Sequence, residues 1–303
     1  MSKYWIWALL VICNLFWAGN YVFGKYVIAQ MTPLWITFAR WTLALFFLFP
    51  IAHFIEKPEW NKAKNEWFSL ICLGLLGVIG YNLVLYSALE YTTATNAALV
   101  SALNPCVIVI FSIVLYRESI SLLQVLGFSL SLIGALVVLS NGDMERLLQV
   151  QFNRGDLLMV AAVIMWTLYS LVAKRMATPP ITATAISTAF AVLLMAPFAF
   201  SQGIDMAQIG SLAITGIIYM VVFPSICSFV FWNIAVQKIG VSKAGIFLNL
   251  IPVFTAMISG ILGERVTGSQ GIGGLLVFLG VYLTTGLLEA YLKKEKPVST
   301  VSG

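Results

Sequence analysis

Long apolar stretches, separated by short polar segments, fill this chain almost from end to end. Ten of them can be marked: Trp5–Phe23, Leu34–Phe54, Trp67–Leu89, Ala97–Tyr116, Leu122–Leu139, Leu157–Val172, Ile181–Phe200, Ile209–Val236, Ala244–Leu262 and Ile272–Leu288. A helix needs about 20 mainly apolar residues to cross a bilayer, and the stretches are close to that length. Strands of a membrane barrel would alternate apolar and polar residues, whereas these stretches are apolar all round. The pattern therefore predicts an all-α integral membrane protein with ten transmembrane helices.

The composition supports lipid as the solvent. Of the 303 residues, 60% are hydrophobic and 10% are charged, whereas a soluble domain carries about 25% charged residues. The longest polar segments are Glu56–Glu66, Ser140–Asp156 and the tail from Lys293, which leave no room for a soluble domain. The first stretch is too long for the apolar part of a signal peptide and no A-x-A-like site follows it, so we interpret it as a retained helix.

The basic residues predict an orientation rather than a nucleic-acid partner. If the N-terminus is cytoplasmic and ten helices alternate, the cytoplasmic segments hold twelve basic residues: Lys3, Lys57, Lys62, Lys64, Arg117, Lys174, Arg175, Lys238, Lys243, Lys293, Lys294 and Lys296. The outer segments then hold four, which are Lys25, Arg146, Arg154 and Arg265. Because cytoplasmic loops carry an excess of Lys and Arg, both termini are predicted to be cytoplasmic, in a multi-pass protein of the cell membrane.

The chain repeats itself at an offset near 147 residues. Trp17 is followed by Lys25 at +8, and Trp166 by Lys174 at +8. "ALEYTTATNAALVSALNP" and "AVQKIGVSKAGIFLNLIP" align without a gap and end at Pro105 and Pro252. Most specifically, Glu118 and Glu264 are each followed by Gln at +6, Gly at +9 and Gly at +16. Such spacing indicates an old duplication.

Five helices in each half make the second half enter the membrane from the opposite side. The sequence therefore predicts two inverted five-helix repeats, in residues 1–140 and 155–292, with an outer connecting loop at 141–154 and a cytoplasmic tail at 293–303. Inverted repeats are typical of transporters that bind substrate near the midplane, between the repeats. Two halves of opposite orientation can exchange roles, which gives alternating access.

Several of these motifs resemble the drug/metabolite transporter superfamily, in particular its ten-helix EamA-type members. They are "NLFWAGNYVFGKY" from Asn14, Arg40, "YSALEYTTATNAALVSALNP" across the third and fourth stretches, the Glu-Ser-Ile…Gln…Gly pattern from Glu118, and "NLIPVFTAMISGILGERVTGSQ" from Asn249. The resemblance covers almost the whole chain. It implies a carrier that moves small metabolites, often amino acids, or drugs across the cytoplasmic membrane, frequently outward. It does not specify the substrate.

Polar and aromatic residues inside the stretches are the candidates for a transport path. Asn14, Trp17, Asn20 and Tyr21 share one helical face. With residues of the other stretches, the candidate substrate-binding or cavity residues are Asn14, Trp17, Asn20, Tyr21, Arg40, Tyr81, Asn82, Tyr86, Ser101, Asn104, Trp166, Tyr169, Tyr219, Ser228, Trp232, Asn233 and Asn249. Aromatic faces with scattered amides and hydroxyls suit an amphipathic organic solute. The alternative for Trp17, Trp166 and Asn20 is helix–helix packing with a neighbouring hydrogen bond.

Arg40 is the charge placed well inside a stretch, six residues after Leu34. A membrane arginine is expensive and is by default a functional hypothesis. It could bind a substrate carboxylate, extend towards the outer headgroups, or bond to helix-end carbonyls. Glu118 and Glu264 lie at stretch ends beside Arg117 and Arg265, where ion pairing or anchoring is favoured over substrate contact.

No chemistry beyond transport is indicated. Cys13, Cys72, Cys106 and Cys227 lie in apolar stretches without metal-ligand spacing, and the single histidine, His53, ends one of them. The sequence therefore predicts no cofactor, no metal and no enzyme activity. The prediction is a transporter of small organic metabolites, an exporter of amino acids or related amphipathic compounds, that works as a monomer. The alternatives are a drug-efflux carrier of the same fold, an integral membrane enzyme, and a scaffold that conducts nothing.

The sequence also bears on what drives transport. Proton-coupled carriers usually hold a carboxylate or histidine chain inside the membrane, and no predicted midplane position here holds a carboxylate. This pattern favours facilitated diffusion or weak coupling.

Overall fold

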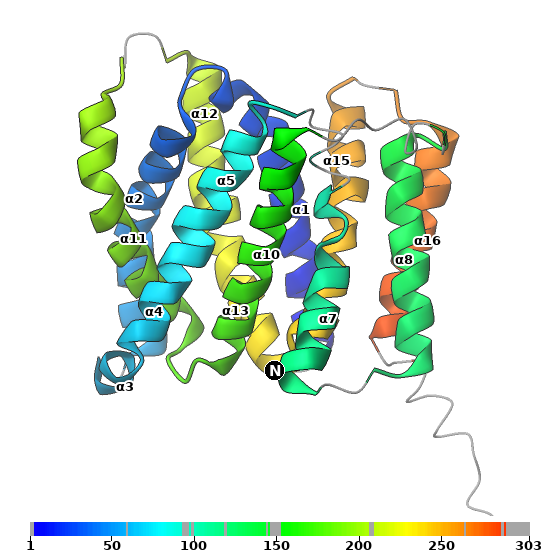
Figure 1. The fold of residues 1–303 in the computed structure, drawn as a ribbon, viewed down its shortest axis with the longest axis horizontal. Coiled ribbons are helices and arrows are strands. Elements are labelled where there is room, and N and C mark those ends of the chain that lie inside the picture. The colour runs from blue at the N-terminus through cyan, green and yellow to red at the C-terminus, as the bar shows by residue number, and fades with distance from the viewer. Residues whose placement is uncertain are drawn as a thin grey trace, which may run out of the picture.

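The computed structural model describes residues 3–58, 60–92, 97, 100–117, 120–143, 145, 153–205, 209–263, 265–285 and 288. Every regular element in these residues is a helix (Figure 1). Glu118, Glu264, the tail 293–303 and most of the loop 141–154 lie outside the described residues, as does the side chain of Lys25.

In the first half, the elements are α1 (Lys3–Ile28), α2 (Pro33–Ile51), η1 (Ala52–Glu56), α3 (Trp60–Asn65), α4 (Trp67–Leu73), η2 (Gly74–Gly80), α5 (Tyr81–Ala88), α7 (Asn104–Tyr116) and α8 (Leu122–Ser140). In the second half, they are α10 (Arg154–Arg175), α11 (Pro180–Gln202), α12 (Ser211–Met220), η4 (Val221–Ser228), α13 (Phe229–Ile239), α14 (Val241–Gly245), η5 (Ile246–Asn249), α15 (Leu250–Ile261) and α16 (Gly268–Thr284).

Eight helical spans in these residues are long and apolar enough to cross a membrane: Tyr4–Ile28, Pro33–Glu56, Trp67–Ala88, Leu122–Ser140, Arg154–Arg175, Pro180–Gln202, Ser211–Ile239 and Val241–Ile261. Two further apolar helices, α7 and α16, are shorter. The fourth predicted stretch began at Ala97, whereas α7 begins at Asn104. The last began at Ile272, whereas α16 begins at Gly268 because Thr267 and Gln270 form a capping box that starts the helix earlier.

The distribution of side chains is the reverse of that in a soluble protein. Large apolar side chains cover the outside: Leu193 is 72% exposed and Ile261 is 83% exposed. Amides are instead buried inside the bundle, and Asn14 and Asn249 are fully enclosed. This arrangement suits a lipid solvent, in which buried polar groups must find partners within the protein.

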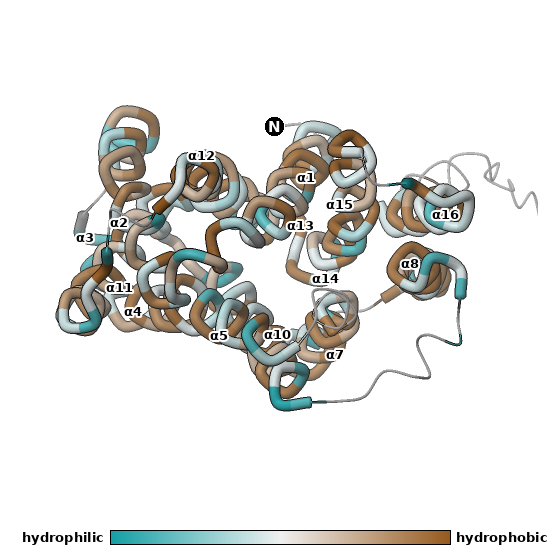
Figure 2. The backbone as a smooth tube through the Cα atoms, turned by 90° about the horizontal axis from the view of Figure 1, so that it is seen from above, coloured by the Kyte–Doolittle hydropathy of each residue, from teal (hydrophilic) through white to brown (hydrophobic). Residues whose placement is uncertain are grey.

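The bundle is elongated in cross-section, with repeat counterparts packed together at both ends. Helices α8 and α16 lie side by side at one end, and α2 and α11 at the other (Figures 1 and 2). Helix α1 begins and α16 ends at the same edge of the bundle (Figure 1).

Glycines bring α8 and α16 into close backbone contact. A Cβ atom placed on Gly127 would lie 2.6 Å from the carbonyl oxygen of Gly280, and one on Gly280 would meet the carbonyl oxygen of Gly127. Gly134 and Gly273 oppose each other in the same way, at 2.6 and 2.7 Å. The two helices are therefore antiparallel, and small residues allow their close approach.

Three of the described membrane spans contain a widened π-helical segment, and two of these segments, η2 and η4, lie at matching places in the two halves. Such segments free backbone carbonyls, and side chains nearby satisfy them. Asn82 Nδ2 donates to the carbonyls of Gly77 and Val78, both at 2.9 Å, and Ser225 Oγ donates to the carbonyl of Met220 at 2.8 Å. The polar residues thus support the irregular backbone from inside the bundle.

The matching prolines, Pro105 and Pro252, each follow an interruption of the helix. Pro105 lies in the first turn of α7, after a turn at Ala102 and Leu103. Pro252 lies in the first turn of α15, after the 3₁₀ segment η5. A proline at this position lacks only an N–H that the helix would leave unpaired anyway. An interruption of the regular α-helix therefore precedes the matching proline in both halves.

Candidate functional site

A cavity of about 600 Å³ lies among α1, α5, α7, α10 and α15. Its described lining comprises Trp17, Asn20, Tyr21, Val22, Gly24, Tyr26, Ile28, Arg40, Tyr81, Asn82, Leu85, Tyr86, Leu89, Thr92, Ser101, Ala102, Asn104, Val138, Leu139, Asn141, Trp166, Phe229, Leu248, Ile251, Pro252, Thr255, Ala256, Ser259, Leu262, Arg265, Val266 and Gln270. On α1, the lining starts only at Trp17, the fifteenth residue of the helix, and continues to its end. The cavity therefore extends from the end of the bundle where α1 finishes to about mid-depth.

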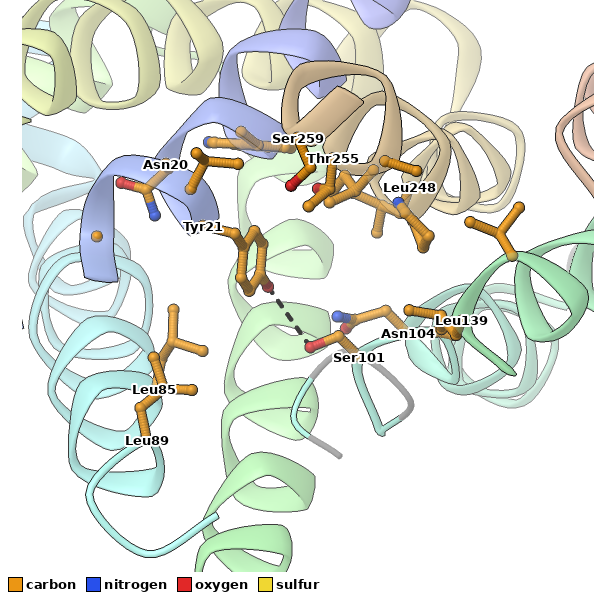
Figure 3. Close-up of a pocket in the computed structure, with 18 of the residues that line it drawn as sticks. Asn20, Tyr21, Leu85, Leu89, Ser101, Asn104, Leu139, Leu248, Thr255 and Ser259 are labelled. Atoms are coloured by element: carbon orange, nitrogen blue, oxygen red, sulfur yellow. Dashed lines mark hydrogen bonds between the residues drawn. The ribbon is translucent and has the colours of Figure 1, made fainter. Parts of the chain in front are cut away.

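Polar groups lie along the upper walls. Tyr21 projects from α1 across the cavity, and its hydroxyl lies 3.5 Å from Ser101 Oγ (Figure 3). Thr255 and Ser259 project from α15 towards the same space (Figure 3). Asn104 lies beside Ser101, and its Oδ1 has no hydrogen-bond partner in the described structure. These groups offer hydrogen bonds to a solute.

The floor is a cluster of aromatic rings. Trp17 and Trp166 meet edge to face with ring centroids 5.1 Å apart, and Tyr81 lies 5.0 Å from Trp166. Beneath them, Tyr169 stacks on Trp166 at 5.2 Å and Trp232 lies 5.6 Å from Trp17. Edge-to-face and offset stacks are the favourable geometries for aromatic pairs. The packed rings close the cavity at mid-depth.

Arg40 is 2% exposed and ties four helical segments together next to the cavity. Its Nε donates to Ser225 Oγ at 2.8 Å, and its Nη1 donates to Tyr86 Oη at 2.6 Å, with Asn82 Oδ1 at 3.3 Å and Asn20 Oδ1 at 3.4 Å. All four partners are neutral. The side chain therefore stays within the bundle and does not extend to the headgroups, and its charge is solvated by hydrogen bonds without an opposite charge.

A second polar network lies below the floor, at positions equivalent to the Arg40 network. Asn233 Nδ2 donates to the Tyr169 hydroxyl at 2.8 Å and to Thr184 Oγ1 at 3.0 Å. The repeat offset relates Asn20 to Tyr169 and Tyr86 to Asn233, so amide and phenol exchange places between the halves. Arg40 has Ser187 as its counterpart, so the second network carries no cation at this position.

Ten of the seventeen predicted residues line the cavity: Trp17, Asn20, Tyr21, Arg40, Tyr81, Asn82, Tyr86, Ser101, Asn104 and Trp166. The other seven, Asn14, Tyr169, Tyr219, Ser228, Trp232, Asn233 and Asn249, do not border it in this conformation. Several of these seven hold helices together, as when Ser228 Oγ donates to the carbonyl of Cys13 at 3.1 Å and Asn249 Nδ2 donates to Ser131 Oγ at 2.8 Å.

Sequence reasoning missed part of the lining. Thr255 and Ser259 are four residues apart, so they share a helical face, and that spacing inside an apolar stretch was the available signal. Asn141 and Gln270 line the cavity from the ends of α8 and α16, and Arg265 lines it from the loop before α16; only the tertiary arrangement brings them to its mouth.

At the opposite end of the bundle, two glutamates of the first half accept hydrogen bonds from residues at the start of α11 and just before it. Glu66 accepts hydrogen bonds from the N–H groups of Ala177 and Thr178, both at 2.8 Å, and from the Thr178 hydroxyl at 2.6 Å. Glu56 similarly accepts from Ile181 N–H at 2.9 Å and Thr182 N–H at 2.7 Å, at the N-terminus of α11. Partial burial raises the pKa of Glu66, but these hydrogen bonds outweigh it and hold the pKa below its usual value.

The described residues contain no group of three His, Cys, Asp or Glu side chains that could hold a metal ion. The cavity instead offers aromatic faces, hydroxyls, amides and one buried guanidinium. Its volume falls in the range of small-molecule sites, about 300–1,000 Å³. The arrangement can therefore enclose a small organic solute.

The family model described as the EamA-like transporter family matches residues 4–140 and again 153–286. The chain belongs to this family. It is a multi-pass membrane transporter of the drug/metabolite type, and neither its family nor its named relatives are enzymes.

Among its relatives, the uncharacterized transporter YyaM of Bacillus subtilis (strain 168) is 29% identical over 297 residues, which cover 96% of this chain and 97% of YyaM. The aromatic amino acid exporter YddG of Ancylobacter novellus is 26% identical over 220 residues, covering 70% of this chain and 74% of YddG. A solved crystal structure shares the fold with a TM-score of 0.75 at 20% identity, over 95% of this chain and all of that one.

Proposed function

We propose that this transporter exports small organic metabolites, either amino acids or related amphipathic compounds, across the cell membrane by alternating access. The observation that carries the proposal is a cavity whose described lining runs from one end of the bundle to mid-depth, with hydrogen-bonding walls above an aromatic floor. Hydrogen bonds would orient the solute and the rings would hold its apolar part. The relative named as an aromatic amino acid exporter makes aromatic amino acids the first substrates to test.

In the proposed topology, α7 and α16 are the remaining two spans, which gives ten spans as two inverted five-helix repeats in residues 1–140 and 155–292. The reciprocal contacts between α8 and α16 support it. The repeat offset relates Gly127 to Gly273 and Gly134 to Gly280, and each glycine faces the counterpart of the other. Such reciprocity is what a two-fold axis in the membrane plane requires.

The proposed orientation places both termini in the cytoplasm, as the excess of basic residues requires. The cavity then faces outward. Labelling of single cysteines introduced at Lys25 and Lys174, in a background without native cysteines, tests this. Lys25 should react from the outside and Lys174 from the cytoplasm, and reaction of both from one side would overturn the topology.

The repeat offset relates residues of the cavity wall to residues at the opposite end of the bundle. These counterparts could line a cavity there in an inward-facing state. The offset of 147 relates the cavity residues Thr255 and Ser259 to Ile108 and Ser112. Both counterparts are fully buried at the closed end, and a Cβ on Gly245 would lie 3.0 Å from Ile108 Cγ2. Ser112 Oγ is buried without a hydrogen-bond partner in the described structure, and exposure to water would relieve that unfavourable burial.

Purified protein in proteoliposomes tests the function. Labelled phenylalanine, tyrosine and tryptophan, together with aliphatic amino acids and a set of amphipathic drugs, are followed across the membrane against protein-free vesicles. Saturable flux of the amino acids supports the proposal, and flux of the drugs alone would replace it with drug efflux. No flux for any compound above the protein-free vesicles would overturn it.

A further inference from the structure

The charge distribution around the cavity is one-sided. Two arginines line it, Arg40 at depth and Arg265 at the mouth, and the described lining contains no aspartate or glutamate. The nearest buried carboxylate behind the wall, Asp156, is already engaged: it accepts from the Thr92 hydroxyl at 2.6 Å and from Asn153 N–H at 2.9 Å. A solute that enters the cavity therefore meets the positive charges of two arginines, and the described lining offers no carboxylate to neutralise them.

Arg40 also keeps unused donors. Its Nε and Nη1 are engaged by the four neutral partners, whereas Nη2 has no acceptor among the described residues and is not sealed from the cavity. Arginine holds five N–H donors in a planar fork that matches a carboxylate. The four existing bonds fix the orientation of the guanidinium, so the free edge is already positioned before a ligand binds.

The aromatic floor lies within reach of that guanidinium. Asn20, an Arg40 partner, is one helical turn from Trp17 on α1, about 5 Å along the axis at 1.5 Å per residue. Tyr81 packs 5.0 Å from Trp166 and lines the same cavity as Arg40. A molecule with a ring on the floor can therefore place a carboxylate that two carbon atoms separate from the ring at Arg40.

We propose that the cavity selects aromatic carboxylates, with Arg40 Nη2 binding the carboxylate and the Trp17–Trp166–Tyr81 floor binding the ring, and that it does not need an ammonium group on the solute. The proposal rests on the proposed transport function. An ammonium has no described carboxylate to pair with in the lining, and two arginines repel it. Cation–π contact with the rings is the remaining attraction for a cation.

Three ligands of matched shape separate the charges: 3-phenylpropionate carries only the carboxylate, phenethylamine only the ammonium, and phenylalanine both. Binding to the purified protein in lipid nanodiscs is measured by calorimetry, with empty nanodiscs as the blank, so that permeation of the bilayer plays no part. We expect 3-phenylpropionate to bind at least tenfold more tightly than phenethylamine, and phenylalanine to bind no more tightly than 3-phenylpropionate.

Variants of Arg40 connect the preference to the guanidinium. Arg40→Met should weaken binding of 3-phenylpropionate about ten- to a hundredfold and abolish the preference over phenethylamine. Arg154→Met makes the same charge change at an exposed site and should keep the preference. If Arg40→Met does not fold, Arg40→Lys keeps the charge without the fork and should still weaken 3-phenylpropionate several-fold.

Equal binding of phenethylamine and 3-phenylpropionate would overturn the inference, as would tenfold tighter binding of phenylalanine than of 3-phenylpropionate. So would no binding of the three ligands by a protein that transports other compounds. These results would leave the transport proposal standing when the flux panel is positive. Absence of flux for the whole panel would instead overturn transport itself.

Discussion

Replacing Gly273 by alanine should separate α8 from α16 and destabilise the protein. A Cβ at this position would lie 2.7 Å from the carbonyl oxygen of Gly134, with Val138 Cγ2 at 2.8 Å and Val138 N at 2.9 Å. Ordinary contact begins at 3.4 Å, so the oxygen contact is 0.7 Å too short. Two of these three atoms belong to the α8 backbone, which no side-chain rotation can move aside.

The magnitude follows from how membrane helices associate. Between apolar helices in lipid, packing and dispersion supply most of the attraction, because the lipid chains are equally apolar. A gap of roughly 0.5–1 Å forfeits a quarter to a half of each dispersion contact along the interface. Overpacking of this kind costs about 1–3 kcal/mol. We therefore expect Gly273→Ala to destabilise the protein by about 2 kcal/mol.

The matched control is Gly271→Ala, two residues earlier on the same helix. A Cβ there meets nothing within 4 Å. Alanine is a better helix former than glycine by about 0.8–1.0 kcal/mol, so this variant should be unchanged or slightly more stable. The assay is thermal unfolding of both variants and the parent in one detergent, followed by intrinsic fluorescence.

The proposed inverted repeat adds a second expectation. Gly127, the counterpart of Gly273, makes an equivalent contact with Gly280, so Gly127→Ala should destabilise to a similar extent. A Gly273→Ala variant as stable as Gly271→Ala would refute the close antiparallel packing. Unequal losses at Gly127 and Gly273, by more than twofold in free energy, would argue against the reciprocal interface.

Two other changes test the cavity floor and the opposite end of the bundle. Trp17→Ala and Trp166→Ala should each reduce flux at least tenfold, a larger effect than their loss of stability accounts for, because their rings line the cavity; flux and thermal melting are measured in parallel. Glu66→Gln should lower stability by about 1 kcal/mol near pH 7 because it weakens the charge-assisted hydrogen bonds to Ala177 and Thr178. The pKa of Glu66 is lower in the folded protein than its unfolded value near 4.3. The stability that the Glu66 carboxylate contributes is therefore complete above the unfolded value and is lost as the pH falls through the folded pKa. The melting curves of parent and variant should converge in acid.

The controls for these changes lie elsewhere in the chain. Trp35 packs on Phe38 and Phe200 away from the cavity, so Trp35→Ala should affect flux no more than it affects stability. Glu90 is exposed, so Glu90→Gln should leave melting unchanged across the same pH range. Parallel losses of flux and stability for both floor tryptophans would reduce them to packing residues. A Glu66→Gln difference that persists in acid would show that the charge of Glu66 is not the cause.

The irregular parts of the fold depend on tertiary and local contacts that the pattern of apolar stretches does not predict. Apolar length located the spans, but the π segments η2 and η4 form where Asn82 and Ser225 can reach the freed carbonyls. The start of α7 at Asn104 and the start of α16 at Gly268 depended on Pro105 and on a capping box, which act locally. The starts of these two helices therefore differ from the predicted stretches, whereas the prediction of an all-helical fold is confirmed for the described residues.

The sequence by itself determined that this chain is helical, that lipid is its solvent and that its two halves are related. The length of an apolar stretch and a repeat at a fixed offset can both be recognised along the chain without knowledge of how it folds. It also marked most of the polar residues near the path, since an amide or a guanidinium in an apolar stretch is too costly to face lipid. Only the tertiary structure decided which of them share a cavity. Asn82 and Asn233 look alike in the sequence, yet one lines the open side and the other lies beneath the aromatic floor. The cavity occupies one end of the bundle, so positions that the repeat offset relates acquire different surroundings.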